Sequence, residues 1–228
     1  MRVVITAGPT REPFDPIRYL SNRSSGRMGY ALARASIAAN HDTTLISGPV
    51  SLRAPRGARM VQIVTGADLQ LAMHEKCAGA DLVILCAAVC DFRPRIVAEK
   101  KLPRVAGTWN PELVETPDLA AELGAMRVGR PSCIVAFAAE THDTETRAAE
   151  KLQRKQCDFI VANDVSQADS GMDSEWNAVT LLNQSGVIWR SGRMKKTSLA
   201  RTLFKRILTF DGNIIDKLFT SSLATEPK

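Results

Sequence analysis

An uninterrupted apolar run, LVILCAA, occupies residues 82–88. A strand that is apolar on both faces must be covered on both, which is typical of a central strand in a parallel sheet that lies between two layers of helices. Further short apolar runs alternate along the chain with segments of helical periodicity. The expected strands are 2–7, 43–47, 60–64, 82–88, 133–138 and 159–162, and the expected helices are 26–39, 68–77, 117–126 and 144–155. This alternation predicts an α/β fold with an open, doubly wound, mostly parallel (Rossmann-like) sheet.

The last part of the chain breaks this pattern. The runs NAVTLL and GVIW flank a short polar turn and predict a β-hairpin, and residues 199–210 predict a closing helix. The 228 residues fit a single domain, 1–228, and 221–228 are expected to form a flexible tail. No stretch of 18 apolar residues exists and the N-terminus lacks a signal-peptide pattern. The five cysteines are odd in number and lack C-x-x-C spacing, so we expect reduced thiols in a cytoplasmic protein.

In such a sheet, ligands bind beyond the carboxyl ends of the strands, so the loops that follow the strands are the candidate sites. The first loop carries SNRSSGRMG and opens a helix. A helix N-terminus offers unpaired N–H groups, and the serines, glycines, Arg23 and Arg27 around it suit a phosphate monoester. Simple capping of the helix by Ser25 is the structural alternative.

The later loops also carry candidate ligand groups. Asp91 follows the central strand, where a carboxylate can hold a ribose hydroxyl or Mg²⁺. Lys100, Lys101 and Arg104 form a short basic run that favours anion binding. Lys151 and Lys155 are spaced i, i+4 on one helix face and can converge on one polyphosphate. Phe137 could stack on a base or pack in the core, and Asn163 with Asp164 could simply make a turn.

Two other classes of protein fit the sequence less well. A nicotinamide-dependent reductase needs a G-x-G-x-x-G turn after the first strand and an acid after the second, but these positions read TAGPT and LISGPV. A nucleic-acid-binding or other non-catalytic nucleotide-binding module would suit the net charge of +6. However, aromatic residues make up only 5%, and the densest basic segment, RMKKTSLARTLFKR, is interpreted as the solvated face of an amphipathic helix.

An ordered set of motifs identifies the family. ITAGPTREPFDPIRYLSNRSSGRMGYALA, LISGPVSL, AAVCDFRP, AEKK, NPELV, FAAET, KLQRKQCDFIVANDV and NAVTLL occur in this order and cover most of the chain. The chain resembles the bacterial phosphopantothenoylcysteine synthetases, the ligases of coenzyme A biosynthesis. The resemblance implies that the carboxylate of 4′-phosphopantothenate attacks the α-phosphate of CTP, forming an acyl-cytidylate and releasing pyrophosphate. The amine of cysteine then attacks the acyl carbon and releases CMP.

The resemblance also implies roles for individual residues. Asn22 would contact the acyl intermediate, and Lys100 would neutralise charge on the triphosphate, so these two are the expected catalytic residues. The expected phosphopantothenate-binding residues are Gly8, Asn22, Ser24, Ser25, Gly26, Gly29, Ala88 and Asn163. The expected CTP-binding residues are Cys86, Ala87, Asp91, Lys100, Pro111, Glu112, Leu113, Val114, Phe137, Lys151 and Lys155. The family's AAVADY is AAVCDF here and its KIKK is replaced by KKLPR, so either Lys100 or Lys101 is the aligned lysine.

The resemblance further implies Mg²⁺ carried by the triphosphate, no flavin and no NAD, and a homodimer whose interface lies near the segment around Lys100. Many relatives are fused to a flavin-dependent decarboxylase. We expect this chain to be a stand-alone synthetase whose decarboxylase partner is a separate chain, with no nucleic-acid or membrane partner.

Overall fold

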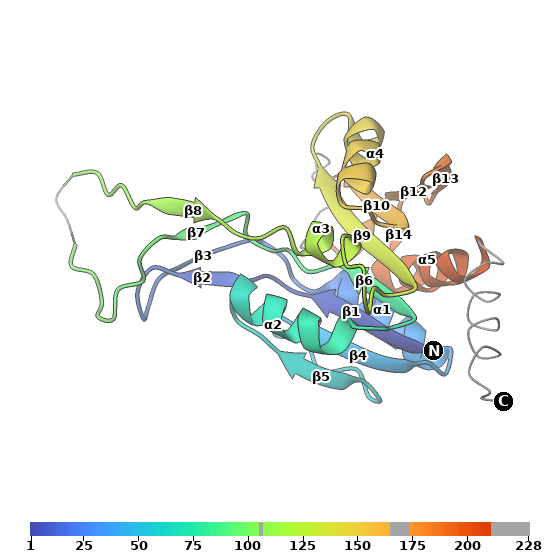
Figure 1. Cartoon of the computed structure of the whole chain (residues 1–228), viewed down its shortest axis with the longest axis horizontal. Helices are drawn as coiled ribbons and strands as arrows, with labels where there is room; N and C mark the ends of the chain where they lie inside the picture. The colour runs from blue at the N-terminus through green and yellow to red at the C-terminus, as the bar shows by residue number, and fades with distance from the viewer. Residues whose placement is uncertain (105–106, 165–173, 211–228) are drawn as a thin grey trace.

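The computed structural model describes residues 1–104, 107–164 and 174–210. Its centre is an eight-stranded sheet in the order β13-β12-β10-β9-β6-β1-β4-β5 (Figure 1). Neighbouring strands are parallel along the series β5, β4, β1, β6, β9 and β10. The pairs β10–β12 and β12–β13 are antiparallel. The sheet strands are β1 (Arg2–Ala7), β4 (Asp42–Ser47), β5 (Arg59–Gln62), β6 (Leu82–Leu85), β9 (Cys133–Glu140), β10 (Phe159–Asp164), β12 (Val179–Asn183) and β13 (Gly186–Arg190). None of the helices in the described part of the chain has the length and apolarity to cross a membrane.

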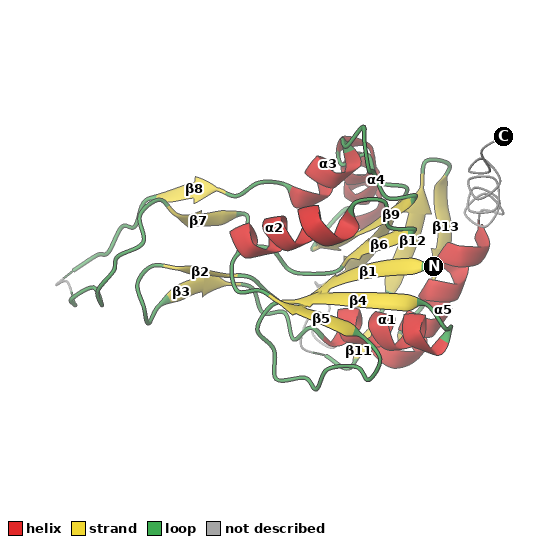
Figure 2. Ribbon diagram, turned by 60° about the horizontal axis from the view of Figure 1, so that its bottom comes forward, coloured by secondary structure: helices red, strands yellow, loops and turns green. Residues whose placement is uncertain are grey.

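Helices cover both faces of this sheet (Figure 2). The helices are α1 (Arg27–Ala38), α2 (Gly66–Cys77), α3 (Leu119–Gly124), α4 (Thr144–Arg154) and α5 (Lys196–Phe210). α1 and α5 pack against each other on one face, and α2, α3 and α4 cover the other. Successive strand residues point to opposite faces, so Val3 and Ile5 enter the core under α1 and α5 while Val4 enters the core on the other face. The sheet thus separates two apolar cores.

A long arm projects from the sheet (Figure 1). It consists of two antiparallel pairs: β2 (Arg11–Pro13) with β3 (Tyr19–Ser21), and β7 (Phe92–Pro94) with β8 (Leu113–Glu115). We call these four strands, with the loops between β2 and β3 and between β7 and β8, the arm. At its base, the buried Glu12 carboxylate accepts a hydrogen bond of 2.8 Å from the N–H of Gly66, which ties β2 to the start of α2.

The β2–β3 turn of the arm is held by a buried carboxylate. Asp15 accepts hydrogen bonds from the N–H groups of Ile17 and Arg18, both at 2.8 Å, and from the N–H of Leu102 at 3.1 Å. Phe14 adds two contacts to the long β7–β8 loop. Its carbonyl oxygen accepts from the N–H of Ala98, and its ring lies 5.0 Å from the Trp109 ring. The β2–β3 turn therefore supports the segment that carries Lys100.

The predicted fold class is confirmed, including the hairpin and the last helix. β6 and α3 are shorter than expected, ending at Leu85 and Gly124, and β9 continues to Glu140. The arm is a correction, because the segments that follow the first strand and the central strand were expected to be loops only. A last short pair, β11 (Trp176–Asn177) with β14 (Met194–Lys195), was not predicted either. The expected tail, 221–228, lies outside the described residues.

Candidate active site

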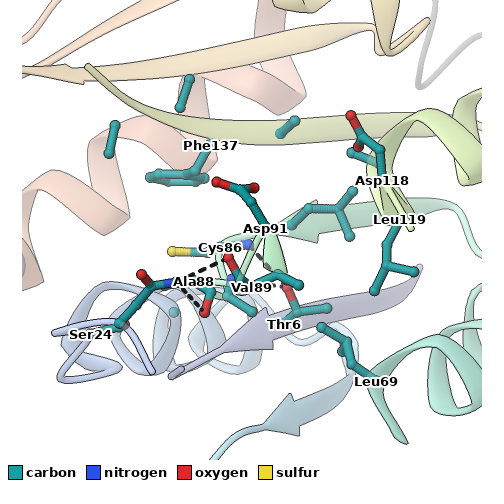
Figure 3. Close-up of a pocket in the computed structure, with 18 of the residues that line it drawn as sticks. Thr6, Ser24, Leu69, Cys86, Ala88, Val89, Asp91, Asp118, Leu119 and Phe137 are labelled. Atoms are coloured by element: carbon teal, nitrogen blue, oxygen red, sulfur yellow. Dashed lines mark hydrogen bonds between the residues drawn. The ribbon is translucent and has the colours of Figure 1, made fainter. Parts of the chain in front are cut away.

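The candidate site is a cavity of about 680 Å³ at the carboxyl ends of the central strands. It lies at the point where the strand order of the sheet reverses. From β1 the chain passes through α1 to β4, the neighbour of β1 on one side, and later returns to β6, the neighbour of β1 on the other side. Thr6 of β1, Leu85 of β6 and Ala136 of β9 all line it. Figure 3 shows Ser24 at one end of this view, Asp118 and Leu119 at the other, and Asp91 and Phe137 between them. This crevice is where doubly wound sheets bind their ligands.

One wall of the cavity is the N-terminus of α1. Gly26, its N-cap, has a φ of 74°, a left-handed conformation that suits glycine, and it has no side chain that could cap the helix. The first turn contains no acidic residue and begins with Arg27, which also lines the cavity. A Cβ on Gly29 would lie 2.5 Å from the Cβ of Ala7, so Gly29 allows the helix to approach β1 closely. This wall offers backbone N–H groups and positive charge to an anion.

The floor of the cavity is backbone from the loop after β6. The hydroxyl of Thr6 accepts hydrogen bonds from the N–H groups of Cys86 at 3.1 Å and Ala87 at 3.0 Å. The amide of Asn22 donates to the carbonyl oxygens of Ala88 and Val89. Burial raises the pKa of the Cys86 thiol to about 12 against the opposing charge of Lys196, so this thiol stays protonated and is a poor nucleophile.

The opposite wall is formed by α3 and α4 and carries two lysines. Lys155 Nζ lies 2.7 and 2.8 Å from the two carboxylate oxygens of Asp118, and both residues line the cavity. Lys151 Nζ lies 2.5 Å from a carboxylate oxygen of Glu140. Burial by itself raises the pKa of Asp118, but hydrogen bonds from Lys155 and from the N–H of Ala121 outweigh it and keep that pKa below its usual value. Both lysines are thus fixed by carboxylates.

The structure brings most of the sequence-predicted residues to this one cavity. Those that line it are Asn22, Ser24, Gly26, Gly29, Cys86, Ala87, Ala88, Asp91, Phe137, Lys151, Lys155 and Asn163. Gly8 and Ser25 lie close by without lining it. Gly8 has a φ of 75° and its carbonyl oxygen accepts from the N–H of Ala88 at 2.9 Å, so it supports the floor from behind.

The remaining predicted residues lie on the arm and do not line the cavity. Lys100 is exposed in the β7–β8 loop, and Pro111, Glu112, Leu113 and Val114 lie in or next to β8. Leu113 and Val114 pair with β7, and Glu112 forms an ion pair of 2.6 Å with Arg95. The assignment of Lys100 and of the four residues in or next to β8 to the nucleotide site stays a prediction. It requires these parts of the arm to lie against a nucleotide bound in a cavity.

Sequence reasoning missed two polar residues on the α5 side of the cavity. Lys196, the first residue of α5, is 5% exposed, and Asn177 in β11 is 3% exposed; both line the cavity. The interpretation of the basic segment as a solvated face is correct for Arg201, Lys205 and Arg206, which are exposed, but wrong for Lys196. Sequence position could not reveal that Lys196 is buried. Lys195 and Lys196 both precede the apolar residues of α5, yet Lys195 is exposed.

Cationic side chains outnumber acidic ones among the cavity-lining residues that the structure describes. The basic residues are Arg27, Lys151, Arg154, Lys155 and Lys196, and the acidic ones are Asp91, Glu115 and Asp118. The basic residues come from α1 and α5 on one side and from α4 on the other, so the cavity can hold anionic groups at both ends. Asp91, between them, is an oxygen donor of the kind that ribose hydroxyls and Mg²⁺ prefer.

Known proteins match this chain along nearly its whole length. The family model described as DNA/pantothenate metabolism flavoprotein C-terminal domain matches residues 1–210. Coenzyme A biosynthesis bifunctional protein CoaBC from Vibrio cholerae is 46% identical over 187 residues, which cover 81% of this chain and 47% of that protein. The same protein from Escherichia coli is 43% identical over 190 residues, covering 82% and 46%. The chain therefore spans about half the length of these curated relatives.

Solved structures agree with the sequence match. The crystal structure of the C-terminal domain of CoaBC superposes with a TM-score of 0.76 at 35% identity, covering 90% of this chain and 93% of that one. A Cab2 mutant in complex with phosphopantothenate-cysteine has a TM-score of 0.77, and at 14% identity it supports the fold alone. The family resemblance drawn from the motifs is confirmed: this chain belongs to the DNA/pantothenate metabolism flavoprotein C-terminal domain family, which includes the C-terminal domain of CoaBC.

Proposed function

We propose that this domain is a phosphopantothenate–cysteine ligase that activates its acid substrate with CTP. The observation that carries the proposal is the single cavity with a helix N-terminus at one end and the Lys151–Lys155 pair at the other. A phosphate monoester at α1 and a triphosphate at α4 would place a carboxylate and an α-phosphate between them. The family membership supports this assignment.

The proposed reaction has two steps. In the first, a carboxylate oxygen of 4′-phosphopantothenate attacks the α-phosphate, an acyl-cytidylate forms, and pyrophosphate leaves. In the second, the cysteine amine attacks the acyl carbon, loses a proton, and CMP leaves. Asn22 lines the cavity and contacts its floor, and in this proposal its amide orients the mixed anhydride. Mg²⁺ would enter with the triphosphate and offset its charge, and Asp91 fits as an oxygen ligand or as the partner of a ribose hydroxyl.

The arm supports a homodimer. Eleven large apolar side chains are exposed in the described residues, and seven of them lie on the arm: Ile17, Tyr19, Phe92, Ile96, Val97, Trp109 and Leu113. A concentrated exposed apolar surface is typical of a protein–protein interface. In this proposal a second copy of the chain covers the exposed apolar side chains of the arm. Lys100 then contacts a triphosphate bound in a cavity of the dimer.

The test uses the purified chain with 4′-phosphopantothenate, cysteine, Mg²⁺ and each nucleoside triphosphate in turn. We expect pyrophosphate, CMP and phosphopantothenoylcysteine with CTP, and pyrophosphate without free CMP when cysteine is left out. Failure to release pyrophosphate from any triphosphate would overturn the ligase assignment. Equal turnover with ATP and CTP would overturn only the nucleotide preference.

A further inference from the structure

Glu140 is a buried carboxylate at the last position of β9. Its side chain is 4% exposed, and it lies between two cationic side chains of α4. One oxygen lies 2.5 Å from Lys151 Nζ, and the other accepts a hydrogen bond of 2.7 Å from Arg147 Nε. Among the described residues that line the cavity, Lys151 is present but Glu140 and Arg147 are not. The carboxylate therefore holds Lys151 from behind.

The local backbone makes this arrangement rigid. Only three residues separate Glu140 from α4, and Asp143, the N-cap, has a φ of 45°. Arg147 and Lys151 are spaced i, i+4, so both face the end of β9. A free lysine loses much rotamer freedom when it binds a ligand, whereas a lysine already held by a buried carboxylate has lost that freedom on folding.

The other lysine of the pair is held differently. The partner of Lys155 is Asp118, which itself lines the cavity and has a side chain that is 40% exposed. A phosphate that binds Lys155 must compete with Asp118 in the same space. A phosphate that binds Lys151 can approach from the cavity while Glu140 stays in place behind it.

We propose that Glu140 is a positioning residue for the nucleotide phosphates, acting by holding Lys151 toward the cavity. This inference rests on the proposed function, because it takes the anion at Lys151 to be the triphosphate. Two residues of the FAAET motif thus differ in their roles: Phe137 lines the cavity, and Glu140 positions Lys151.

The experiment is a double-mutant cycle on CTP binding, measured by calorimetry with the full chain and Mg²⁺. Glu140→Gln keeps the size of the side chain and removes its charge; we expect the Kd for CTP to rise about tenfold. In a Lys151→Met background, the same change should alter Kd by less than about twofold, because the residue through which it acts is gone. Arg147→Met, the matched control, removes the other partner of Glu140 and should leave Kd within about twofold of wild type.

Three results would overturn the inference. They are an unchanged Kd in Glu140→Gln, an equal loss in the Lys151→Met background, and a loss in Arg147→Met as large as that in Glu140→Gln. If Glu140→Gln fails to fold, Glu140→Asp keeps the charge and draws it back by one methylene. It should raise Kd in the wild-type background and leave it unchanged beside Lys151→Met. Wild-type pyrophosphate release, measured in parallel, separates this inference from the ligase assignment, which fails only if the wild type is inactive.

Discussion

The side-chain nitrogen of Asn22 lies 3.0 Å from the carbonyl oxygen of Val89. The same nitrogen lies 3.2 Å from the carbonyl oxygen of Ala88, so it donates into the turn that follows β6. The contact joins the two loops that diverge at the centre of the sheet and fixes the floor of the cavity. Asn22 therefore both lines the cavity and connects two loops.

This contact sharpens the expected effect of Asn22→Asp. A carboxylate cannot donate to Ala88 and Val89, and its charge would face two carbonyl oxygens and the reacting anions. We expect turnover to fall by about 100-fold or more, with CTP affinity changed only a few-fold. Rapid quench that follows pyrophosphate and CMP separately, with and without cysteine, checks this. If Asn22→Asp forms both products at the wild-type rate, Asn22 serves only to connect the loops.

Lys100 is expected to act on the chemistry more than on binding. Lys100→Gln removes a charge that would meet the triphosphate as its negative charge redistributes, so turnover should fall about 100-fold while phosphopantothenate affinity holds. Steady-state kinetics of Lys100→Gln beside Lys101→Gln gives the comparison. A loss in Lys101→Gln alone would assign the role to Lys101.

Asp15 should matter for catalysis although it lies on the arm. Its carboxylate accepts the N–H of Leu102, and Arg18 donates to the Leu102 carbonyl oxygen at 2.9 Å. Asp15→Ala removes the support on the C-terminal side of Lys100, so we expect faster hydrogen exchange at residues 98–102 and lower turnover. Asp42→Ala, which loses an exposed ion pair with Arg59, is the control and should change neither quantity. Unchanged exchange in Asp15→Ala would contradict this account.

The ion cluster around Glu140 predicts how stability depends on pH. Burial by itself raises the pKa of Glu140, but the ion pair with Lys151 and the hydrogen bond from Arg147 outweigh it and hold the pKa below its usual 4.5. The stabilisation is therefore complete above pH 4.5 and is lost as pH falls through the lower folded-state pKa. We expect the free energy of unfolding of the wild type to decrease as pH falls below 4.5, and that of Glu140→Gln to decrease less. Urea titrations across this range measure both; identical slopes would count against the cluster.

The apolar arm predicts the oligomeric state. Ile96 is 79% exposed on the arm, and Ile96→Asp should convert a dimer into monomers because a charge would be buried in the interface. Val128 is 87% exposed outside the arm, so Val128→Asp is the matched control and should stay dimeric. Light scattering over a range of concentrations gives the mass of each. A monomeric wild type, or a dimer that Ile96→Asp leaves intact, would reject the arm as the interface.

The central architecture was predictable because it depends on patterns that single residues do not disturb. LVILCAA marks the middle of the sheet, since only a strand buried on both faces tolerates such a run. The arm was not predictable in this way. Its strands are three residues long, and they are held by distant polar contacts such as that of Glu12 with Gly66 and that of Asp15 with Leu102.

The candidate site was likewise predictable in part. Residues at strand ends, such as Asp91 and Phe137, could be placed because parallel strands bring their carboxyl ends to one edge. Lys196 could not, because its burial depends on how α5 packs against α1 on the far side of the sheet. Glu140 had a visible signal, an acid directly after an apolar strand, but its pairing with Lys151 depends on the tight turn at Asp143.

The route of the chain through the arm connects the proposed dimer interface to the lining of the cavity. β3 ends at Ser21, directly before Asn22, β7 begins at Phe92, directly after Asp91, and β8 ends at Glu115. Asn22, Asp91, Phe92 and Glu115 all line the cavity, so a partner that immobilised the arm would also restrain the loops that line the cavity. Any coupling between two binding equilibria is thermodynamically reciprocal. In the proposed dimer, the factor by which dimerisation tightens substrate binding equals, per site, the factor by which substrate tightens the dimer, so the proposed activity would depend on the concentration of the domain itself.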